Sequence, residues 1–125
     1  AQGYVRGRPI TITVVRVDGK PVEAVTAEAY LRMQAAAARE RRPVRLKIVS
    51  GFRTMEHQQA LYADYRAHRG NLAARPGRSN HQSGHALDLN TQAPGVLHWL
   101  NRNARRFGFR RTIPSEPWHW ESWPP

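Results

Sequence analysis

The stretch from Arg69 to Gly84 constrains this chain most, because it is rich in glycine, asparagine, serine and proline and lies inside a short sequence. Its composition predicts one long loop. A structureless loop of that length is uncommon in a small domain unless it carries function. The 125 residues suit one compact domain, so the helices and strands on either side must be arranged around this loop.

Alternation of apolar residues with a period of two predicts several short strands. The first covers Ile10 to Val17, and Asp18-Gly19 is a strong hairpin signal before a return strand over Val22 to Val25. Further strands are predicted over residues 44–49, 86–90, 109–113 and 118–121.

Three helices are predicted between these strands. Thr26 can cap the first, from Ala27 to about Arg41, with Leu31 on its buried side. Thr54 can cap the second, which reaches about residue 68 and has Leu61, Tyr62 and Tyr65 as its apolar stripe. The third covers residues 94–107, with Pro94 in its first turn.

Together these elements predict an α+β fold, in which a central antiparallel sheet is flanked by helices. We expect a single domain over residues 1–125, with an N-terminal hairpin and helix in residues 1–43 and a catalytic core in residues 44–121. No apolar stretch approaches the roughly 20 residues that a membrane span needs.

Composition limits the partners and the metal ligands. Lys and Arg number 20 against nine acidic residues, a formal net charge of +11, which implies an anionic partner surface. The basic residues are not clustered on one predicted helix and no nucleic-acid-binding motif is evident, so nucleic acid is not expected as the partner. There is no cysteine, so a transition metal must use His, Asp or Glu.

Two segments supply such ligands. His81 lies in the long loop and Asp88 in the strand that follows, where alternation sends Leu87 to the core and Asp88 toward a pocket. His119, on an extended segment, can face the same pocket. Two imidazoles and one carboxylate suit a catalytic zinc, although they tolerate several divalent ions, and His85 is a rival ligand.

Two further side chains can act beside such a metal. Glu116 is the best candidate for the general base that takes a proton from the attacking water. Arg53, at a strand-to-helix turn, can stabilise negative charge on a carbonyl oxygen or grip a substrate carboxylate.

Taken together, the segments from about Val44 to Glu121 resemble the family of zinc D-Ala-D-Ala carboxypeptidases and L-alanyl-D-glutamate peptidases. Each piece of the family pattern is weak, but the joint pattern is highly specific. The pieces appear here in the family's order, as Ser50-Gly51-Phe52-Arg53, Gln58, Leu61-Tyr62, Ser79-x-His81-x-x-Gly84-x-Ala86-x-Asp88, Trp99-Leu100, Asn103-Ala104-x-x-Phe107-Gly108-Phe109 and Glu116-x-Trp118-His119.

The resemblance implies that one zinc ion is bound by His81, Asp88 and His119, at the edge of the sheet. It implies that Glu116 is the base, and that substrate is contacted by Arg53, Gln58 and Ser79; Trp118 would add an apolar wall or be part of the core.

The expected activity is hydrolysis of a stem-peptide amide bond in peptidoglycan, most simply of the D-Ala-D-Ala type, by an extracytoplasmic monomer. The alternatives are an L-alanyl-D-glutamate endopeptidase and a non-catalytic wall-binding module.

Overall fold

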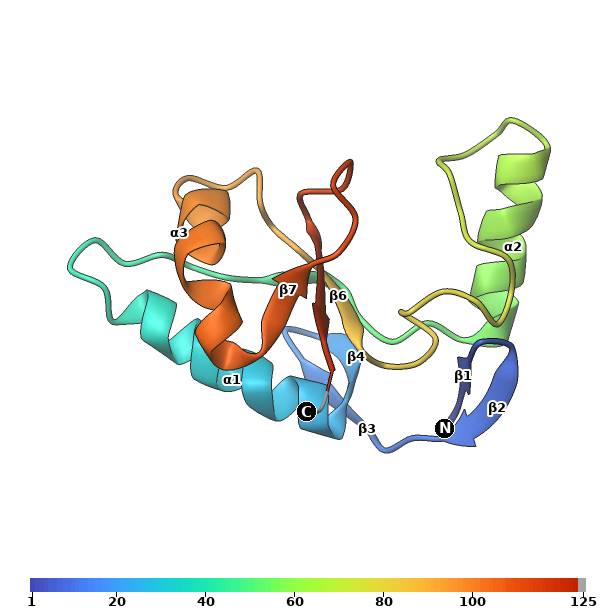
Figure 1. Cartoon of the computed structure of the whole chain (residues 1–125), viewed down its shortest axis with the longest axis horizontal. Coiled ribbons are helices and arrows are strands. Elements are labelled where there is room, and N and C mark those ends of the chain that lie inside the picture. The colour runs from blue at the N-terminus through green and yellow to red at the C-terminus, as the bar shows by residue number, and fades with distance from the viewer. Residues whose placement is uncertain (124–125) are drawn as a thin grey trace.

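The computed structural model describes residues 1–123, and it begins with two consecutive β-hairpins (Figure 1). Strand β1 (Gln2–Val5) pairs with β2 (Arg8–Thr11), and β3 (Val14–Val17) pairs with β4 (Lys20–Glu23), both antiparallel. Asp18 and Gly19 form the second turn with positive φ angles of 53° and 77°, which confirms the predicted hairpin signal.

The prediction of one strand from residue 10 to 17 is wrong, because the chain changes partner halfway. Its first half pairs with β1, which the sequence analysis did not predict, and its second half pairs with β4. Between them the backbone amide of Ile12 donates to the carbonyl of Ala1, and Thr13 accepts from the amide of Ala24. Apolar alternation continues across this change of partner and therefore hides it.

Helix α1 (Ala24–Ala38) begins earlier than predicted, and its cap is Glu23 rather than Thr26. The Glu23 carboxylate accepts from the backbone amides of Val25 and Thr26, while the buried Thr26 hydroxyl donates to the carbonyl of Gly84. Thr26 thus fastens the helix to the end of the long loop. Leu31 is 47% exposed, so its predicted burial is wrong.

A four-stranded antiparallel sheet forms the centre of the molecule, in the strand order β5-β6-β8-β7. Its strands are β5 (Ile48–Ser50), β6 (Ala86–Leu89), β7 (Phe109–Arg111) and β8 (His119–Ser122). The strand predicted from residue 44 is reduced to β5. Before it, the Asn90 side chain accepts from the amide of Lys47 and donates to the carbonyl of Arg45, in place of a ladder.

One face of this sheet is covered by α1 and by α3 (Val96–Asn103), which continues into the 3-10 turn η1 (Ala104–Phe107) (Figure 1). The core between them includes Tyr30, Met33, Leu87, Leu100 and Trp120. The face opposite this core is therefore left for polar side chains.

Helix α2 (Met55–Arg66) lies at the opposite end of the molecule from α1 and α3 (Figure 1). Its predicted cap is confirmed, since Thr54 Oγ1 accepts from the amide of His57. The predicted apolar stripe is not core, because the one buried residue of this helix is Gln58.

The long loop after α2 is confirmed, with no helix or strand between residues 67 and 85 of the described chain. The β1–β2 hairpin braces it, because the amides of Tyr4 and Gly7 donate to the carbonyls of Gln82 and Gly77. Within residues 1–123, no helix has both the length and the apolar composition that a membrane crossing requires. The predicted boundary near residue 43 remains a prediction.

Candidate metal centre

The three predicted ligands meet on the polar face of the sheet. Asp88 in β6 and His119 in β8 are register partners, and Leu87 and Leu89 point into the core as alternation predicts. His81 reaches the same place from the long loop. Metal-ligating atoms of His81, Asp88 and His119 all lie within 4.8 Å of one another.

Three hydrogen bonds fix the position of His81. Its amide donates to Ser79 Oγ, its carbonyl accepts from the amide of Arg53, and its ring Nδ1 lies 2.9 Å from the carbonyl oxygen of Gly51. A carbonyl accepts but does not donate, so Nδ1 carries the proton and the second nitrogen, Nε2, is left as the ligand. Nε2 is 3.0 Å from Asp88 Oδ1.

In His119 the roles of the two ring nitrogens are reversed. Its Nε2 donates to the carboxylate of Glu121 at 2.7 Å, and its Nδ1 lies 3.5 Å from Asp88 Oδ1. Each imidazole therefore has one nitrogen bonded to an acceptor outside the site and the other directed to Asp88. Metal-binding histidines are oriented in this way, so the residues fit one metal ion.

Glu121 contacts the predicted ligand His119 and was not predicted from the sequence. It is 4% exposed, and its carboxylate accepts hydrogen bonds from Asn80, Thr112, His119 and Trp123. Alternation along β8 is the signal that could have found it, because residues 119 and 121 share one face.

Electrostatics around the group favour a positive charge between its members. Burial by itself would lower the pKa of His119, but its hydrogen bonds to Asp88 and Glu121 raise that pKa to about 9. Burial would raise the pKa of Asp88, but hydrogen bonds from His119 and His81 hold it below its usual range. For Glu121, burial is likewise outweighed by its donors, which bring the pKa to about 2.

Glu116 approaches from a turn before β8. The amide of His119 donates to the Glu116 carbonyl, which closes this turn, and Glu116 Oε1 lies 3.8 Å from His119 Nδ1. A carboxylate at that separation can act on a molecule bound between the ligands.

Arg53 also lines the cleft beside the group. Its guanidinium donates to Gln58 Oε1 at 2.9 Å, and its Nε is buried without a partner in the described structure. Burial lowers the pKa of this guanidinium, whereas the charges of Asp88 and Glu116 oppose that shift. Gln58 is fully buried and also donates to the carbonyl of Ala74. It therefore orients Arg53 from behind.

The His-Asp-His group, Glu116 and Arg53 open onto one cleft of about 690 Å³. Gln58 does not line this cleft and has no exposed surface, so the prediction that it contacts substrate is not supported by the structure. Ser79 and Trp118 line it, and Trp118 is 41% exposed, whereas Trp120 is core. The rival ligand His85 lies apart: its ring stacks on Trp123 at 3.8 Å, and its Nδ1 is 2.8 Å from the Ser122 carbonyl oxygen.

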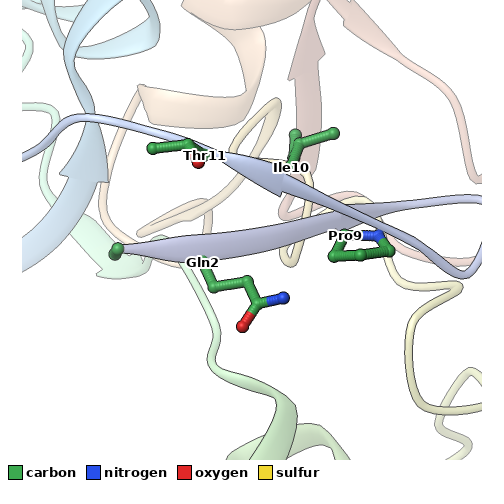
Figure 2. Close-up of a pocket in the computed structure, with 5 residues that line it drawn as sticks. Gln2, Pro9, Ile10 and Thr11 are labelled. Atoms are coloured by element: carbon green, nitrogen blue, oxygen red, sulfur yellow. The ribbon is translucent and has the colours of Figure 1, made fainter.

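A second hollow, of about 400 Å³, lies on the β1–β2 hairpin (Figure 2). It is lined by Ala1, Gln2, Pro9, Ile10 and Thr11, whose side chains carry no titratable group. The chemistry of this molecule is therefore concentrated in the cleft with the His-Asp-His group.

Two histidines and an aspartate, with a second carboxylate and a guanidinium beside them in a cleft, define the class of mononuclear metallohydrolases. The family model described as VanY, D-alanyl-D-alanine carboxypeptidase, matches residues 19–124. The chain belongs to this family.

Individual curated relatives support the family assignment. A D-alanyl-D-alanine carboxypeptidase of Enterococcus faecalis is 34% identical over an alignment of 103 residues, and the match covers 58% of this chain and 38% of the relative. A second curated relative, from Bacillus subtilis, is 25% identical and is covered over 47% of its length. The chain thus spans less than half the length of these curated relatives.

Solved structures show the same fold. A variant of the vancomycin-resistance D,D-pentapeptidase VanY in complex with Zn(II) superposes with a TM-score of 0.75, at 27% identity, over 95% of this chain and 85% of that one. VanYB in complex with D-alanine-D-alanine gives 0.74 at 28% identity, over 95% and 83%. The LD-carboxypeptidase LdcB gives 0.70 at 25% identity, over 86% and 62%.

Proposed function

We propose that this protein is a zinc-dependent carboxypeptidase that removes the terminal D-alanine from peptidoglycan stem peptides ending in D-Ala-D-Ala. The observation that carries the proposal is the convergence of His81, Asp88 and His119 within 4.8 Å at a cleft beside Glu116. Family membership and the D-alanine-D-alanine complex of VanYB support the choice of substrate.

His81, Asp88 and His119 would hold the zinc ion. Zinc, when bound, supplies a Lewis acid and lowers the pKa of a water to about 7. The Glu116 carboxylate takes a proton from the attacking water as the water oxygen bonds to the peptide carbonyl carbon. It then gives this proton to the leaving nitrogen as the C–N bond breaks. The second proton of the water also passes to the amine, so that a carboxylate and an ammonium group result.

Arg53 serves the carbonyl oxygen, on which negative charge develops. Gln58 holds one terminal nitrogen of the guanidinium, and Arg53 lines the cleft. A fixed cation in a cleft with little water stabilises such an oxyanion more than water does. Ser79 and Trp118 would contact the peptide from the walls of the cleft.

A synthetic stem pentapeptide tests the proposal. We expect mass spectrometry to detect loss of one D-alanine, and Glu116→Ala or chelation to abolish that loss. Release of L-alanine would instead indicate the L-alanyl-D-glutamate alternative, and the absence of any product with zinc-loaded protein would contradict the proposal.

A second candidate is an L,D-carboxypeptidase, which takes the tetrapeptide instead. Two structural matches support this candidate. One is LdcB, and the other is an L,D-carboxypeptidase of Streptococcus pneumoniae, at 29% identity and a TM-score of 0.60. Offering penta- and tetrapeptide at equal concentration separates the two activities. Faster cleavage of the tetrapeptide would show that the enzyme is an L,D-carboxypeptidase rather than a D,D-carboxypeptidase.

The proposed location follows from the substrate. Peptidoglycan lies outside the cytoplasmic membrane, so we propose an extracytoplasmic, secreted protein that acts as a monomer. Fractionation of cells and light scattering of the purified protein test these two statements.

A further inference from the structure

The positive charge of the chain is concentrated in two short segments. Residues 39–47 and 102–111 hold ten of the 20 Lys and Arg residues but one of the nine acidic residues, and so account for nine of the eleven net positive charges. The remaining residues of the chain are nearly neutral in sum. Such a distribution forms a local surface rather than a diffuse coat.

The fold brings these two segments together. The first follows the end of α1 and the second covers the end of α3 with η1, which packs against α1. Trp99 Nε1 in α3 donates to Glu40 Oε1 at 3.3 Å. The one acidic residue of the segments therefore ties the first segment to α3, the helix in which the second segment begins.

Aromatic stacking extends this junction. The ring of Phe107 stacks on Trp99 at 6.2 Å, and the guanidinium of Arg106 covers the Phe107 ring at 4.9 Å. The two segments that meet at this junction carry six exposed arginines, which we call the arginine cluster: Arg39, Arg41, Arg42, Arg102, Arg105 and Arg106.

The arginine cluster is separate from the cleft. It lies on the α1–α3 side of the sheet, whereas α2 and the long loop border the cleft on the other side (Figure 1). No residue of the two segments is among those lining the cleft, where four carboxylates outnumber two guanidinium groups. The excess positive charge therefore does not serve to draw a peptide into the metal centre.

These arginines are also unpaired. Among residues 1–123, the Lys and Arg side chains in ion pairs with carboxylates are Arg32 and Arg69, and both lie outside the arginine cluster. Guanidinium groups bind phosphates bidentately and lose less hydration than ammonium groups do. A ligand with repeated phosphates matches six such groups on one surface.

Nucleic acid fits the surface less well. Single-stranded nucleic acid is bound by stacking bases on exposed aromatic rings, but here Trp99 is 5% exposed and Phe107 lies beneath Arg106. A flexible chain that offers phosphates without bases needs no such platform.

We propose that the arginine cluster binds a phosphodiester polymer of the cell wall, a chain of polyol phosphates, and so holds the enzyme beside its peptide substrate. This inference rests on the proposed function for the identity of the polymer. Binding at a second surface raises the local concentration of the cleft near the wall without changing the reaction itself.

The test measures binding of fluorescently labelled poly(glycerol phosphate) by anisotropy at several salt concentrations. One variant carries Arg41→Gln, Arg42→Gln, Arg102→Gln and Arg105→Gln. The matched control carries Arg8→Gln, Lys20→Gln, Arg66→Gln and Arg75→Gln, which removes the same charge from exposed positions elsewhere.

We expect the cluster variant to lose at least about tenfold in affinity, and its plot of log K against log salt to become shallower by about 3, since each flexible phosphate contact contributes roughly 0.7. The control should keep most of both. Equal losses in the two variants would overturn the inference, as would tighter binding of single-stranded DNA than of poly(glycerol phosphate).

Peptide cleavage provides the independent readout. Both variants should cleave a soluble pentapeptide as the unaltered protein does, while the cluster variant alone acts more slowly on walls that carry the polymer. Loss of polymer binding with cleavage intact would affect this inference alone. Polymer binding without any cleavage would contradict the proposed function and leave the arginine cluster standing.

Discussion

Replacing Glu121 by glutamine tests how the protein orients His119. The carboxylate accepts the Nε2 proton of His119 at 2.7 Å, and this bond leaves Nδ1 free to bind the proposed zinc ion. An amide has one oxygen where the carboxylate has two, and the four donors around it come from different segments. Whichever way the amide turns, its NH₂ group faces at least one donor that previously had an acceptor.

The size of the effect follows from these contacts. If the NH₂ faces His119, the imidazole must give up its proton at Nε2 and take it at Nδ1, where it blocks the metal. If it faces the other way, Trp123 loses the bond of 2.8 Å to Oε1, and the negative charge behind His119 is lost in either case. Loss of a partner behind a metal-binding histidine costs roughly 10- to 100-fold in metal affinity or activity. That range equals about 1.4 to 2.7 kcal/mol.

The assay is competition for zinc between the protein and a chromophoric chelator. Glu121→Gln should raise the zinc Kd by about 10- to 100-fold. Thr112→Val is the matched control, because it removes another donor to the same carboxylate and leaves the His119 contact in place. The reasoning is refuted if Glu121→Gln binds zinc as tightly as the unaltered protein, or if the control weakens binding equally.

Three further outcomes are expected. Glu116→Gln should keep zinc but lower kcat by about 10²- to 10⁴-fold, as removal of a general base does, measured on the pentapeptide; weaker zinc binding would instead make Glu116 a ligand. Chelation should lower Tm, because zinc at a thousandfold its Kd contributes about 4 kcal/mol to the stability of the folded state. In Asp88→Asn the same treatment should leave Tm nearly unchanged, and an equal shift in that variant would show that zinc binds at another site. Gly3→Val should destabilise the protein by about 1–3 kcal/mol in thermal unfolding, since a Cβ at Gly3 would lie 2.6 Å from the Gln82 carbonyl oxygen. Arg8→Val, at an exposed position of the same hairpin, is its control. Equal losses of stability in the two variants would show that the contact between the hairpin and the long loop is unimportant.

Strand alternation predicted which side chains of β6 face the site, because alternation is a local property of a strand. Leu87 and Leu89 occupy one face of β6, which leaves Asp88 on the other, and no distant contact is needed to reach that conclusion. The same rule applied to β8 separates His119 from Trp120. Convergence of the two strands was implied by the family pattern, and their register was not.

The elements that the sequence did not reveal depend on distant partners. Threonine is the more common cap, but Glu23 caps α1 because the Thr26 hydroxyl donates to the carbonyl of Gly84. The β1–β2 hairpin lies outside the part that matches the family model, and its role becomes visible only through its bonds to the loop of His81. Propensities describe a residue with its neighbours in sequence, so they miss such choices.

Register explains why the orienting residues were harder to predict than the ligands. Pairing of Asp88 with His119 sets Glu121 opposite Ala86, on the same face, where the loop can deliver Asn80 to its carboxylate. A slip of one residue would turn His119 into the core and bring Trp120 to the cleft. The hydrogen bonds of Glu121 to Asn80 and Thr112 tie the loop and the residue after β7 to β8, and so oppose that slip. The residue that orients the metal ligand therefore also helps to fix the register on which the metal site depends.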